Sequence, residues 1–203
     1  MTIRLLTYSL LIILVSCGNV FRPYPTYTSE KILQTIENPY FTDKEEFLYR
    51  ASITVYGHSF NGIFVTKRIN ENEQRIALTT DFGNTLFDFS FIDNKLKINY
   101  IQEDLNRKII IKTLSDDFQK LLKKQFVCNE KIKIPNTTIW KCKDEKEFIY
   151  LFENEKQVIF QQINTKKSKK YTTFAFIIDE NKNAKNIDIQ HYTINIRIIL
   201  NQM

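Results

Sequence analysis

Few side chains in this sequence can do covalent chemistry. They are three cysteines (Cys17, Cys128 and Cys142) and two histidines (His58 and His191). A thiol can be acylated, oxidised to a disulfide or used as a metal ligand, and an imidazole can transfer protons. The positions of these five residues therefore decide which of these chemistries the chain supports.

Cys17 stands at the end of an apolar run. Residues 1–4 carry one positive charge, residues 5–15 are apolar but for three residues, and the small residue Ser16 precedes the cysteine. The run has the length of a signal peptide and is shorter than the ~20 apolar residues that span a bilayer. The segment resembles a bacterial lipoprotein signal peptide with its lipobox.

This resemblance implies that residues 1–16 are removed and that Cys17 carries acyl chains such as palmitate. Two or three chains on one cysteine would hold the mature protein on a membrane. The alternative is an ordinary secretory signal with a cysteine there by chance. Gly18 follows the cysteine, and under the proteobacterial sorting rule the absence of Asp there favours the outer membrane, on the periplasmic side. Residues 17–27 are expected to form a flexible tether.

Cys128 and Cys142 are candidates for a disulfide, because a chain that leaves the cytoplasm meets oxidising conditions. The midpoint between them is Pro135, and Pro135-Asn136 reads as a turn between two strands. A hairpin centred there places the two thiols opposite one another. The alternative is two separate buried thiols.

Neither histidine belongs to a recognisable catalytic constellation. His58 stands in a turn-like Gly-His-Ser sequence and is expected to be solvated, and His191 is expected at the end of a strand. There is no nucleophile elbow, no paired-histidine helix and no cysteine–histidine cluster of metal-ligand spacing. We therefore expect no enzyme, no metal and no cofactor.

Composition limits the partners. The 203-residue chain has a formal charge of +6, which suits an anionic membrane surface, whereas nucleic acid is not an expected partner outside the cytoplasm. Four glycines are too few for a glycine-rich phosphate loop. Residues 28–203 suffice for a single domain with a hydrophobic core.

Most of the chain has the pattern of short β-strands. Apolar and polar residues alternate over 47–55, and further strand-like runs with short polar turns follow. These runs are 63–69, 75–80, 85–92, 95–101, 107–112, 147–152, 157–163, 171–178 and 187–200, the last with a break near His191. Residues 57–62 are expected to form a turn or bulge. The fold class predicted is mainly β, an antiparallel meander that forms an unclosed half-barrel.

Two segments have helical spacing. Residues 30–37, after a capping Thr28 or Ser29, place three apolar residues on one side. A second helix is expected to begin near Ser115, with an apolar stripe that packs on the sheet. The apolar residues of the two helices are Ile32, Leu33 and Ile36, and Leu114, Phe118, Leu121 and Leu122.

An aromatic stripe is the candidate lipid-binding surface. Phe87, Phe89 and Phe91 share one face of a predicted strand, with Asp88 on the opposite, solvent-facing side. On the next strand the stripe continues with Leu96, Ile98 and Tyr100. These side chains either line an apolar pocket for acyl chains or form an ordinary core beneath the second helix.

A lysine-rich turn is the candidate membrane-contact site. It joins two predicted strands and contains Lys166, Lys167, Lys169 and Lys170. Lysines near a membrane surface attract anionic lipid headgroups. The alternative is a solvated hairpin tip.

The order of elements resembles the LolA/LolB-like lipoprotein carriers and acceptors. The stretches 61–65, 75–78 and 82–86 look like the LolB-type pattern, in which glycine-led turns introduce apolar strands. The resemblance covers roughly residues 29–124. It implies an unclosed barrel whose concave apolar face, partly covered by helices, accepts lipid chains. LolB carries a protruding apolar residue on an early loop, whereas the corresponding loop here, residues 70–74, is wholly polar.

The sequence therefore predicts a non-enzymatic lipoprotein of the bacterial envelope, anchored through Cys17. The function expected is binding of lipid or lipoprotein acyl chains in outer-membrane lipoprotein localisation, with lipoproteins or phospholipid as partners. The alternative is a structural or accessory lipoprotein that binds an envelope protein.

Overall fold

The computed structural model describes residues 21–41, 46–145 and 147–203. Its regular structure is a single thirteen-stranded antiparallel sheet with one α-helix, α2 (Lys108–Leu121), and a short 3-10 helix, η2 (Glu103–Leu105). In their order across the sheet the strands are β1 (Ser29–Glu37), β7 (Gln125–Ile134), β8 (Thr137–Asp144), β9 (Glu147–Asn154), β10 (Ile159–Lys166), β11 (Lys169–Ile178), β12 (Ala184–His191), β13 (Ile196–Gln202), β2 (Glu46–Val55), β3 (His58–Arg68), β4 (Glu73–Thr79), β5 (Thr85–Ile92) and β6 (Lys95–Ile101). The sheet is not closed into a barrel, since β1 and β6 lie at its two edges, and this confirms the predicted fold class.

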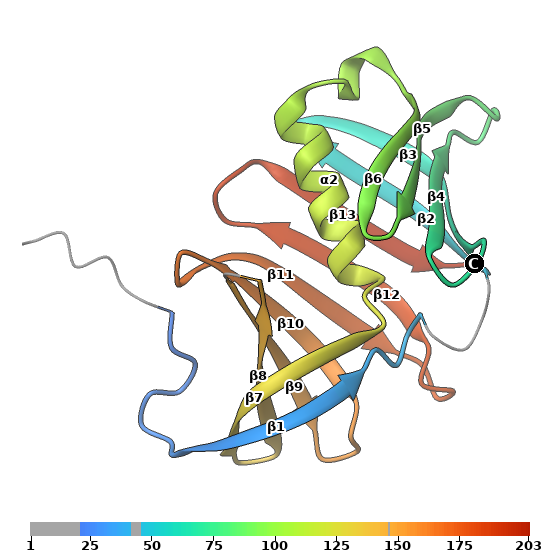
Figure 1. Ribbon diagram of the computed structural model, residues 1–203. Helices are drawn as coiled ribbons and strands as arrows, with labels where there is room; N and C mark the ends of the chain where they lie inside the picture. The colour runs from blue at the N-terminus through green and yellow to red at the C-terminus, as the bar shows by residue number, and fades with distance from the viewer. Residues whose placement is uncertain (1–20, 42–45, 146) are drawn as a thin grey trace, which may run out of the picture.

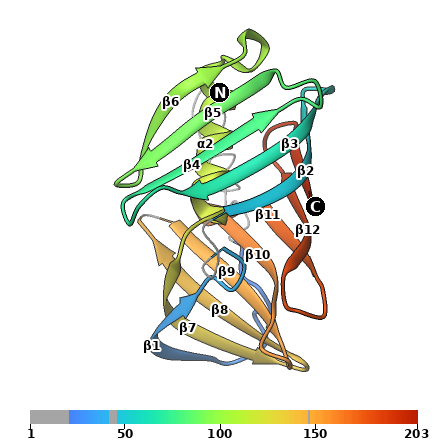
Figure 2. The same cartoon turned by 90° about the vertical axis from the view of Figure 1, so that its right-hand side faces the viewer.

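The sheet curls around α2, as two views at right angles show (Figures 1 and 2). Strands β2–β6 form one half of the curled sheet and β1 with β7–β11 the other, and β12 and β13 run between the halves. Cross-strand pairing carries one buried row across the centre, through Phe174, Ile189, Ile198 and Ile53. The concave face is therefore one continuous hydrophobic core.

Strand β2 shows why this sheet forms. Its alternate residues Phe47, Tyr49, Ala51, Ile53 and Val55 are all buried, and the residues between them are exposed or partly exposed. A period of two places successive side chains on opposite faces of a strand. The alternation predicted from the sequence is confirmed here.

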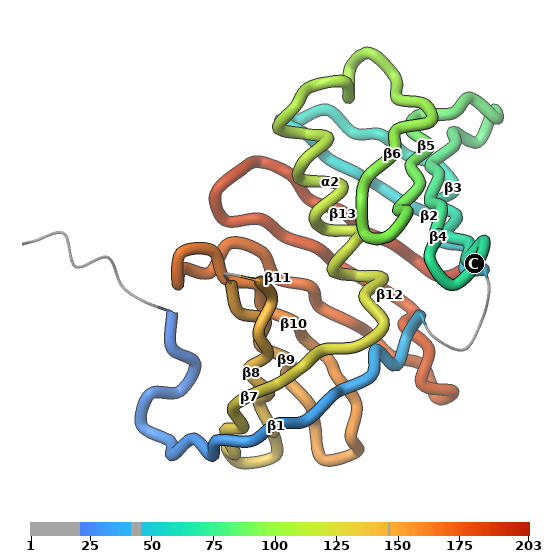
Figure 3. Tube along the Cα trace, in the orientation of Figure 1, coloured from blue at the N-terminus to red at the C-terminus, as the bar shows by residue number. Residues whose placement is uncertain are grey.

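The helix predicted over residues 30–37 is wrong, because this segment is strand β1, paired antiparallel with β7. The trace in Figure 3 shows the two strands side by side although they are far apart in the sequence. Ile32 and Ile36 pack against the core, which either a helix or a strand could achieve, but Leu33 is 84% exposed. Pairing with the backbone of β7 outweighs the local helical spacing.

The strand predicted over residues 107–112 is also wrong, because α2 begins at Lys108 and absorbs this segment. Ile110, Leu114, Phe118 and Leu121 lie on one helix face and are buried, whereas Ile109 is 51% exposed. The burial of this face on the sheet outweighs the β-propensity of three consecutive isoleucines. Ser115, predicted as the helix cap, lies inside the helix instead.

Residues 57–62 do not form one long turn. Only Tyr56 and Gly57 connect β2 to β3, and Gly62 lies within β3, opposite Ala51. A Cβ atom on Gly62 would lie 1.9 Å from the carbonyl oxygen of Thr79. The glycine therefore permits a close approach of the neighbouring β4 backbone.

The end of α2 is fixed by the segment that follows β1. The Asn38 side-chain amide donates to the carbonyl oxygens of Leu121 and Lys123, at 2.8 and 3.0 Å. Carbonyl groups in the last turn of a helix lack intrahelical partners, so these two bonds stabilise that end. They also join the edge of the sheet to the helix that lies in its concavity.

Candidate functional site

The half of the concave face formed by β3 and β5 is apolar, and α2 covers it. The ring of Phe118 on α2 stacks on Phe64, with ring centroids 4.8 Å apart, and lies 5.8 Å from Phe87. Phe87 in turn stacks on Phe89 at 4.9 Å. All four rings are buried, so the helix fills the space against this part of the concave face.

The structure divides the predicted lipid-binding stripe. Phe87, Phe89 and Phe91 are buried on the concave face, and Leu96 packs against the same core. Ile98 and Tyr100 are 42% and 49% exposed on the edge strand β6. These last two do not continue the buried stripe.

A β-bulge explains part of this division. Phe89 pairs with Ile98, but Asp88 pairs with Tyr100, so Asn99 is an extra residue in β6. The bulge moves Tyr100 onto the outer face, with Asp88. There Asp88 forms an ion pair with Arg75 and accepts a hydrogen bond from Asn99 at 3.1 Å.

The other side of α2 meets polar residues of the sheet. Asp117 Oδ2 lies 2.7 Å from His191 Nε2, and the side chains of both residues are at most 2% exposed. The other ring nitrogen of His191, Nδ1, lies 3.5 Å from Thr172 Oγ1. In the part of the chain that the structure describes, Asp117 Oδ1 has no hydrogen-bond partner. We call Asp117, Lys120, Asn164, Thr172 and His191 the polar seam.

Burial has the largest effect on the ionisation of Asp117. It raises the pKa of Asp117, and the hydrogen bond and charge of His191 act in the opposite direction. Burial likewise raises the pKa of Tyr171, next to the seam. A buried carboxyl group without a hydrogen-bond partner is costly, so the contact with His191 stabilises the placement of Asp117 against the sheet.

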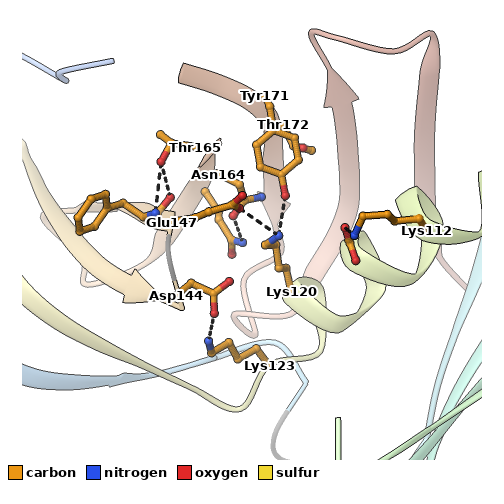
Figure 4. Close-up of polar contacts among 12 residues, drawn as sticks. Lys112, Lys120, Lys123, Asp144, Glu147, Asn164, Thr165, Tyr171 and Thr172 are labelled. Atoms are coloured by element: carbon orange, nitrogen blue, oxygen red, sulfur yellow. Dashed lines mark hydrogen bonds and ion pairs between the residues drawn. The ribbon is translucent and has the colours of Figure 1, made fainter. Parts of the chain in front are cut away.

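Lys120 extends the seam toward the end of the helix (Figure 4). Its ammonium group donates to the Tyr171 hydroxyl at 2.5 Å and lies 4.0 Å from Glu147. Asn164 accepts a hydrogen bond from Gln162, but its own amide nitrogen has no partner within the described residues. A buried polar atom without a hydrogen-bond partner is costly, and water that reached the Asn164 amide could supply the missing bond.

A cleft of about 850 Å³ opens beside the second half of α2. Its walls come from the β3–β4 turn, the helix, the β8–β9 turn and the start of β11. Charged side chains of both signs line it, among them the ion pair of Lys123 with Asp144 at 2.5 Å. The lining suits a polar headgroup, not an acyl chain.

A smaller pocket of about 260 Å³ lies toward the other end of α2. It combines apolar walls with two lysines and reaches the Asp117–His191 pair. The lining residues used below are Tyr56, Ile109, Lys112, Lys166, Tyr171 and Ile194.

The predicted lysine-rich turn is the tip of the β10–β11 hairpin. Lys167 and Ser168 form its two-residue turn, both with positive φ, and Lys166, Lys167 and Lys169 are exposed. The ammonium groups of Lys166 and Lys170 lie over the rings of Tyr171 and Tyr192, at 5.8 and 4.3 Å. The structure thus places the four lysines together at one end of the sheet.

The predicted signal peptide and Cys17 lie outside the described residues. The described chain begins at Phe21, and from there it contacts the domain: Phe21 donates its backbone N–H to the Ser168 carbonyl oxygen at 2.7 Å. Its ring lies edge-on to Tyr150, with centroids 5.2 Å apart. No helix in the described ranges is long and apolar enough to cross a bilayer.

A disulfide joins Cys128 and Cys142, which are cross-strand neighbours in β7 and β8. The turn at Pro135 and Asn136 lies midway between them, so the predicted hairpin is confirmed. Both cysteines are buried on the concave face.

The histidines differ in their surroundings. His58 is exposed at the start of β3. His191 ends β12, as expected, but it is buried against α2, which the sequence alone did not indicate. Within the described part of the chain, no three His, Cys, Asp or Glu side chains form a group that could hold a metal ion.

Sequence reasoning missed the polar seam, although one signal was present. Asp117 stands three residues after Leu114 and directly before Phe118, so it falls on the buried stripe of the helix. A carboxylate on such a stripe needs a partner. Nothing in the sequence shows that the partner is His191, 74 residues away.

Comparisons with known proteins establish similarity of fold only. No family model matches the chain, and no curated protein matches its sequence. Among solved structures, a LolA superfamily protein from Nitrosomonas europaea is similar, with a TM-score of 0.53 and 8% identity. The match covers 80% of this chain and 86% of that protein. A DUF1329 family protein from Desulfovibrio piger also matches, with a TM-score of 0.46 and 6% identity over 79% of this chain and 85% of that one.

Proposed function

We propose that this protein is a non-enzymatic lipoprotein of the bacterial envelope that binds the acyl chains of lipids or lipoproteins. One observation carries the proposal: a half-open sheet with an apolar concave face is covered by the helix α2. The fold is similar to that of a LolA superfamily protein. An unclosed sheet leaves one side open, through which an apolar ligand could reach the concave face.

The proposed anchor is the acylated Cys17, at the periplasmic face of the outer membrane. Its support is the sequence of residues 1–17, a charged start, an apolar run, a small residue and a cysteine. A doubly or triply acylated cysteine stays in the membrane, whereas a single chain holds only marginally. In this proposal the domain stays beside the bilayer from which its ligands come.

Binding of an acyl chain requires α2 to separate from the sheet. The apolar contacts of Phe118 with Phe64 and Phe87 oppose this movement. The Asp117–His191 contact also holds the helix, and on separation water would take over the hydrogen bonds of Asp117, Lys120 and Asn164. An acyl chain would then replace Phe118 against the rings of β3 and β5.

An exposed phenylalanine supports delivery of the ligand to another lipoprotein. Phe82 is 93% exposed at the tip of the β4–β5 turn. It lies one turn later than the wholly polar β3–β4 loop to which the LolB resemblance assigns such a residue. Transfer of an exposed aromatic ring at a turn tip from water into an apolar phase is favourable.

The packed rings beneath α2 favour a second candidate, an accessory lipoprotein that binds an envelope protein. With Phe64, Phe87, Phe89 and Phe118 fully buried, the domain is complete without a ligand. In that role the exposed surface, and not the concave face, would bind the partner.

Native mass spectrometry of the full chain, extracted from membranes in mild detergent, distinguishes the two. The carrier role predicts a population with bound phospholipid or acylated peptide, lost in Phe89→Ala and kept in the matched variant Phe152→Ala. Phe152 is buried on the opposite face of the sheet, in a separate cluster. A ligand-free wild-type protein would support the accessory role.

A further inference from the structure

The N-terminal segment is attached to the β10–β11 hairpin. Phe21 donates its backbone N–H to the Ser168 carbonyl oxygen, at the turn that carries the four lysines. The Phe21 ring also contacts Tyr150 on the outer face of the sheet. The described chain thus begins at this end of the domain, as Figure 1 shows for its blue segment.

The distance from this contact to the proposed anchor is short. Cys17 precedes Phe21 by four residues, and an extended chain spans at most about 3.6 Å per residue, or about 14 Å here. If Cys17 is acylated, as proposed above, Phe21, which is hydrogen-bonded to Ser168, lies within about 14 Å of the lipid-attached residue. The anchor then determines which end of the domain faces the membrane.

Three turns meet at this end: residues 56–58, 166–170 and 191–195. The backbone N–H of Tyr56 donates to the Asn195 carbonyl oxygen, and the backbone N–H of Tyr192 donates to the Tyr171 carbonyl oxygen, both at 2.9 Å. The three turns are therefore neighbours. Together they contain four lysines and no aspartate or glutamate. Tyr56 and Tyr192 are 48% and 49% exposed. We call these three turns the basic end.

We propose that the basic end docks on the surface of an anionic lipid bilayer and so fixes the orientation of the anchored domain. Lysine ammonium groups attract anionic headgroups over about a Debye length, ~8–10 Å. Tyrosines with an apolar ring and a polar hydroxyl favour the membrane–water interface. This inference rests on the acylated anchor of the proposed function and adds the surface that meets the bilayer.

This orientation brings the smaller pocket to the membrane. Lys166, Tyr56 and Ile194 belong to the basic end and also line that pocket. Ile109 and Lys112 of α2 complete its rim, so a lipid could leave the bilayer beside the helix that covers the concave face. The β4–β5 turn that carries Phe82 lies on the other side of the molecule (Figures 1 and 2) and would face away from the anchoring membrane.

The test uses the full chain, with acylation of Cys17 checked by mass, in phosphatidylcholine vesicles with and without phosphatidylglycerol. The lipids carry brominated acyl chains, which quench a nearby indole. Tyr192→Trp reports on the basic end and Phe82→Trp on the opposite orientation. The native Trp140 is buried and gives a constant background.

Charge dependence is tested with two matched pairs of variants in the Tyr192→Trp protein. Lys167→Glu/Lys169→Glu reverses two lysines of the basic end. Lys156→Glu/Lys182→Glu reverses two exposed lysines in the β9–β10 and β11–β12 turns, at the other ends of the same strands. The change in net charge is equal, and each pair includes one residue with positive φ, Lys167 or Lys182.

We expect quenching of Tyr192→Trp with phosphatidylglycerol, its loss in Lys167→Glu/Lys169→Glu, and no loss in the control pair. If acylated protein binds vesicles but the Tyr192→Trp indole is not quenched, the docking surface is overturned and the anchor is left intact. Quenching of the Phe82→Trp indole alone would have the same meaning. Equal quenching in pure phosphatidylcholine, or in both charge-reversal pairs, would overturn recognition of anionic lipid. Protein without acyl mass that does not float with vesicles would overturn the anchor and this inference together.

Discussion

Asp117 on α2 and His191 at the end of β12 lie 2.7 Å apart, with both side chains withdrawn from solvent. This pair is a buried polar contact between the helix and the sheet that surrounds it. It holds the middle of α2 on one side, while Phe118 holds the other side through Phe64 and Phe87. The helix is therefore held by an apolar contact on one side and a buried polar contact on the other.

Replacing one member of this pair should strongly destabilise the domain. His191→Leu leaves Asp117 buried without its partner, at an expected cost of about 3–5 kcal/mol in the free energy of unfolding. The double variant Asp117→Leu/His191→Leu removes both polar groups and should lose less than the sum of the two single variants. Urea denaturation of the four proteins measures the coupling. Additive losses would show that the two side chains do not interact.

A second prediction concerns Gly62, whose Cβ position is occupied by the Thr79 carbonyl oxygen. Gly62→Ala must push β3 and β4 apart, at an expected cost of about 3 kcal/mol. Gly83→Ala is the comparison, since no atom lies within 4 Å of its Cβ position and only its positive φ of 83° opposes alanine. That variant should lose about 1 kcal/mol. Thermal unfolding compares the stabilities of the two variants. An equal loss of stability in both would contradict the close approach of β3 and β4 at Gly62.

The Asp88–Arg75 ion pair should make the stability of the fold depend on pH. The hydrogen bond from Arg75 holds the pKa of Asp88 below its usual range, with a smaller contribution from Asn99. A carboxyl whose pKa is lower in the folded state stabilises the fold above its unfolded pKa, and this contribution disappears as the pH falls through the folded pKa. Because Arg75 is half exposed, we expect less than about 1 kcal/mol at neutral pH.

The measurement compares wild type with Asp88→Asn by urea denaturation from pH 7 down through the acid range. Wild type should be the more stable at pH 7, and the difference should vanish as the pH falls through the folded pKa of Asp88. A difference that stays constant over this range would mean that the charge of Asp88 does not contribute.

The Cys128–Cys142 bond should stabilise the β7–β8 hairpin. For a sequence separation of 14 residues, the chain-entropy model gives a stabilisation of about 3 kcal/mol in the free energy of unfolding. Peptide mapping of the purified protein under non-reducing conditions should find the two cysteines linked, and a reductant should lower the unfolding midpoint. Two thiols that react freely with alkylating agents in the folded protein would contradict the linkage.

The sequence predicted the sheet well because its strands alternate locally, as in β2, and because turns such as Pro135-Asn136 have characteristic residues. It failed where distant partners decide the structure. Residues 30–37 have helical spacing, but the backbone of β7 makes them a strand, and residues 107–112 are β-branched, but the concave face makes them helical. The polar seam was missed for the same reason, since its members come from α2, β10, β11 and β12.

The candidate site was predicted in part. The aromatic spacing of β5 indicated a common face for Phe87, Phe89 and Phe91, which the structure has. The extension to Tyr100 failed because one extra residue, Asn99, reverses the face beyond it. A bulge of this kind depends on how two strands pair, so the alternation within either strand does not reveal it.

The central claim is that an acyl chain binds beneath α2, and Phe89→Trp in a Trp140→Phe background tests it most directly. Trp140 is the only native tryptophan, so the substituted protein carries a single indole on the concave face. If a fatty acid or phospholipid displaces α2 and contacts this face, the emission of the indole should shift in a saturable manner as lipid is added. An emission spectrum that does not change across the titration, in a protein that remains folded, would contradict acyl-chain binding at this site.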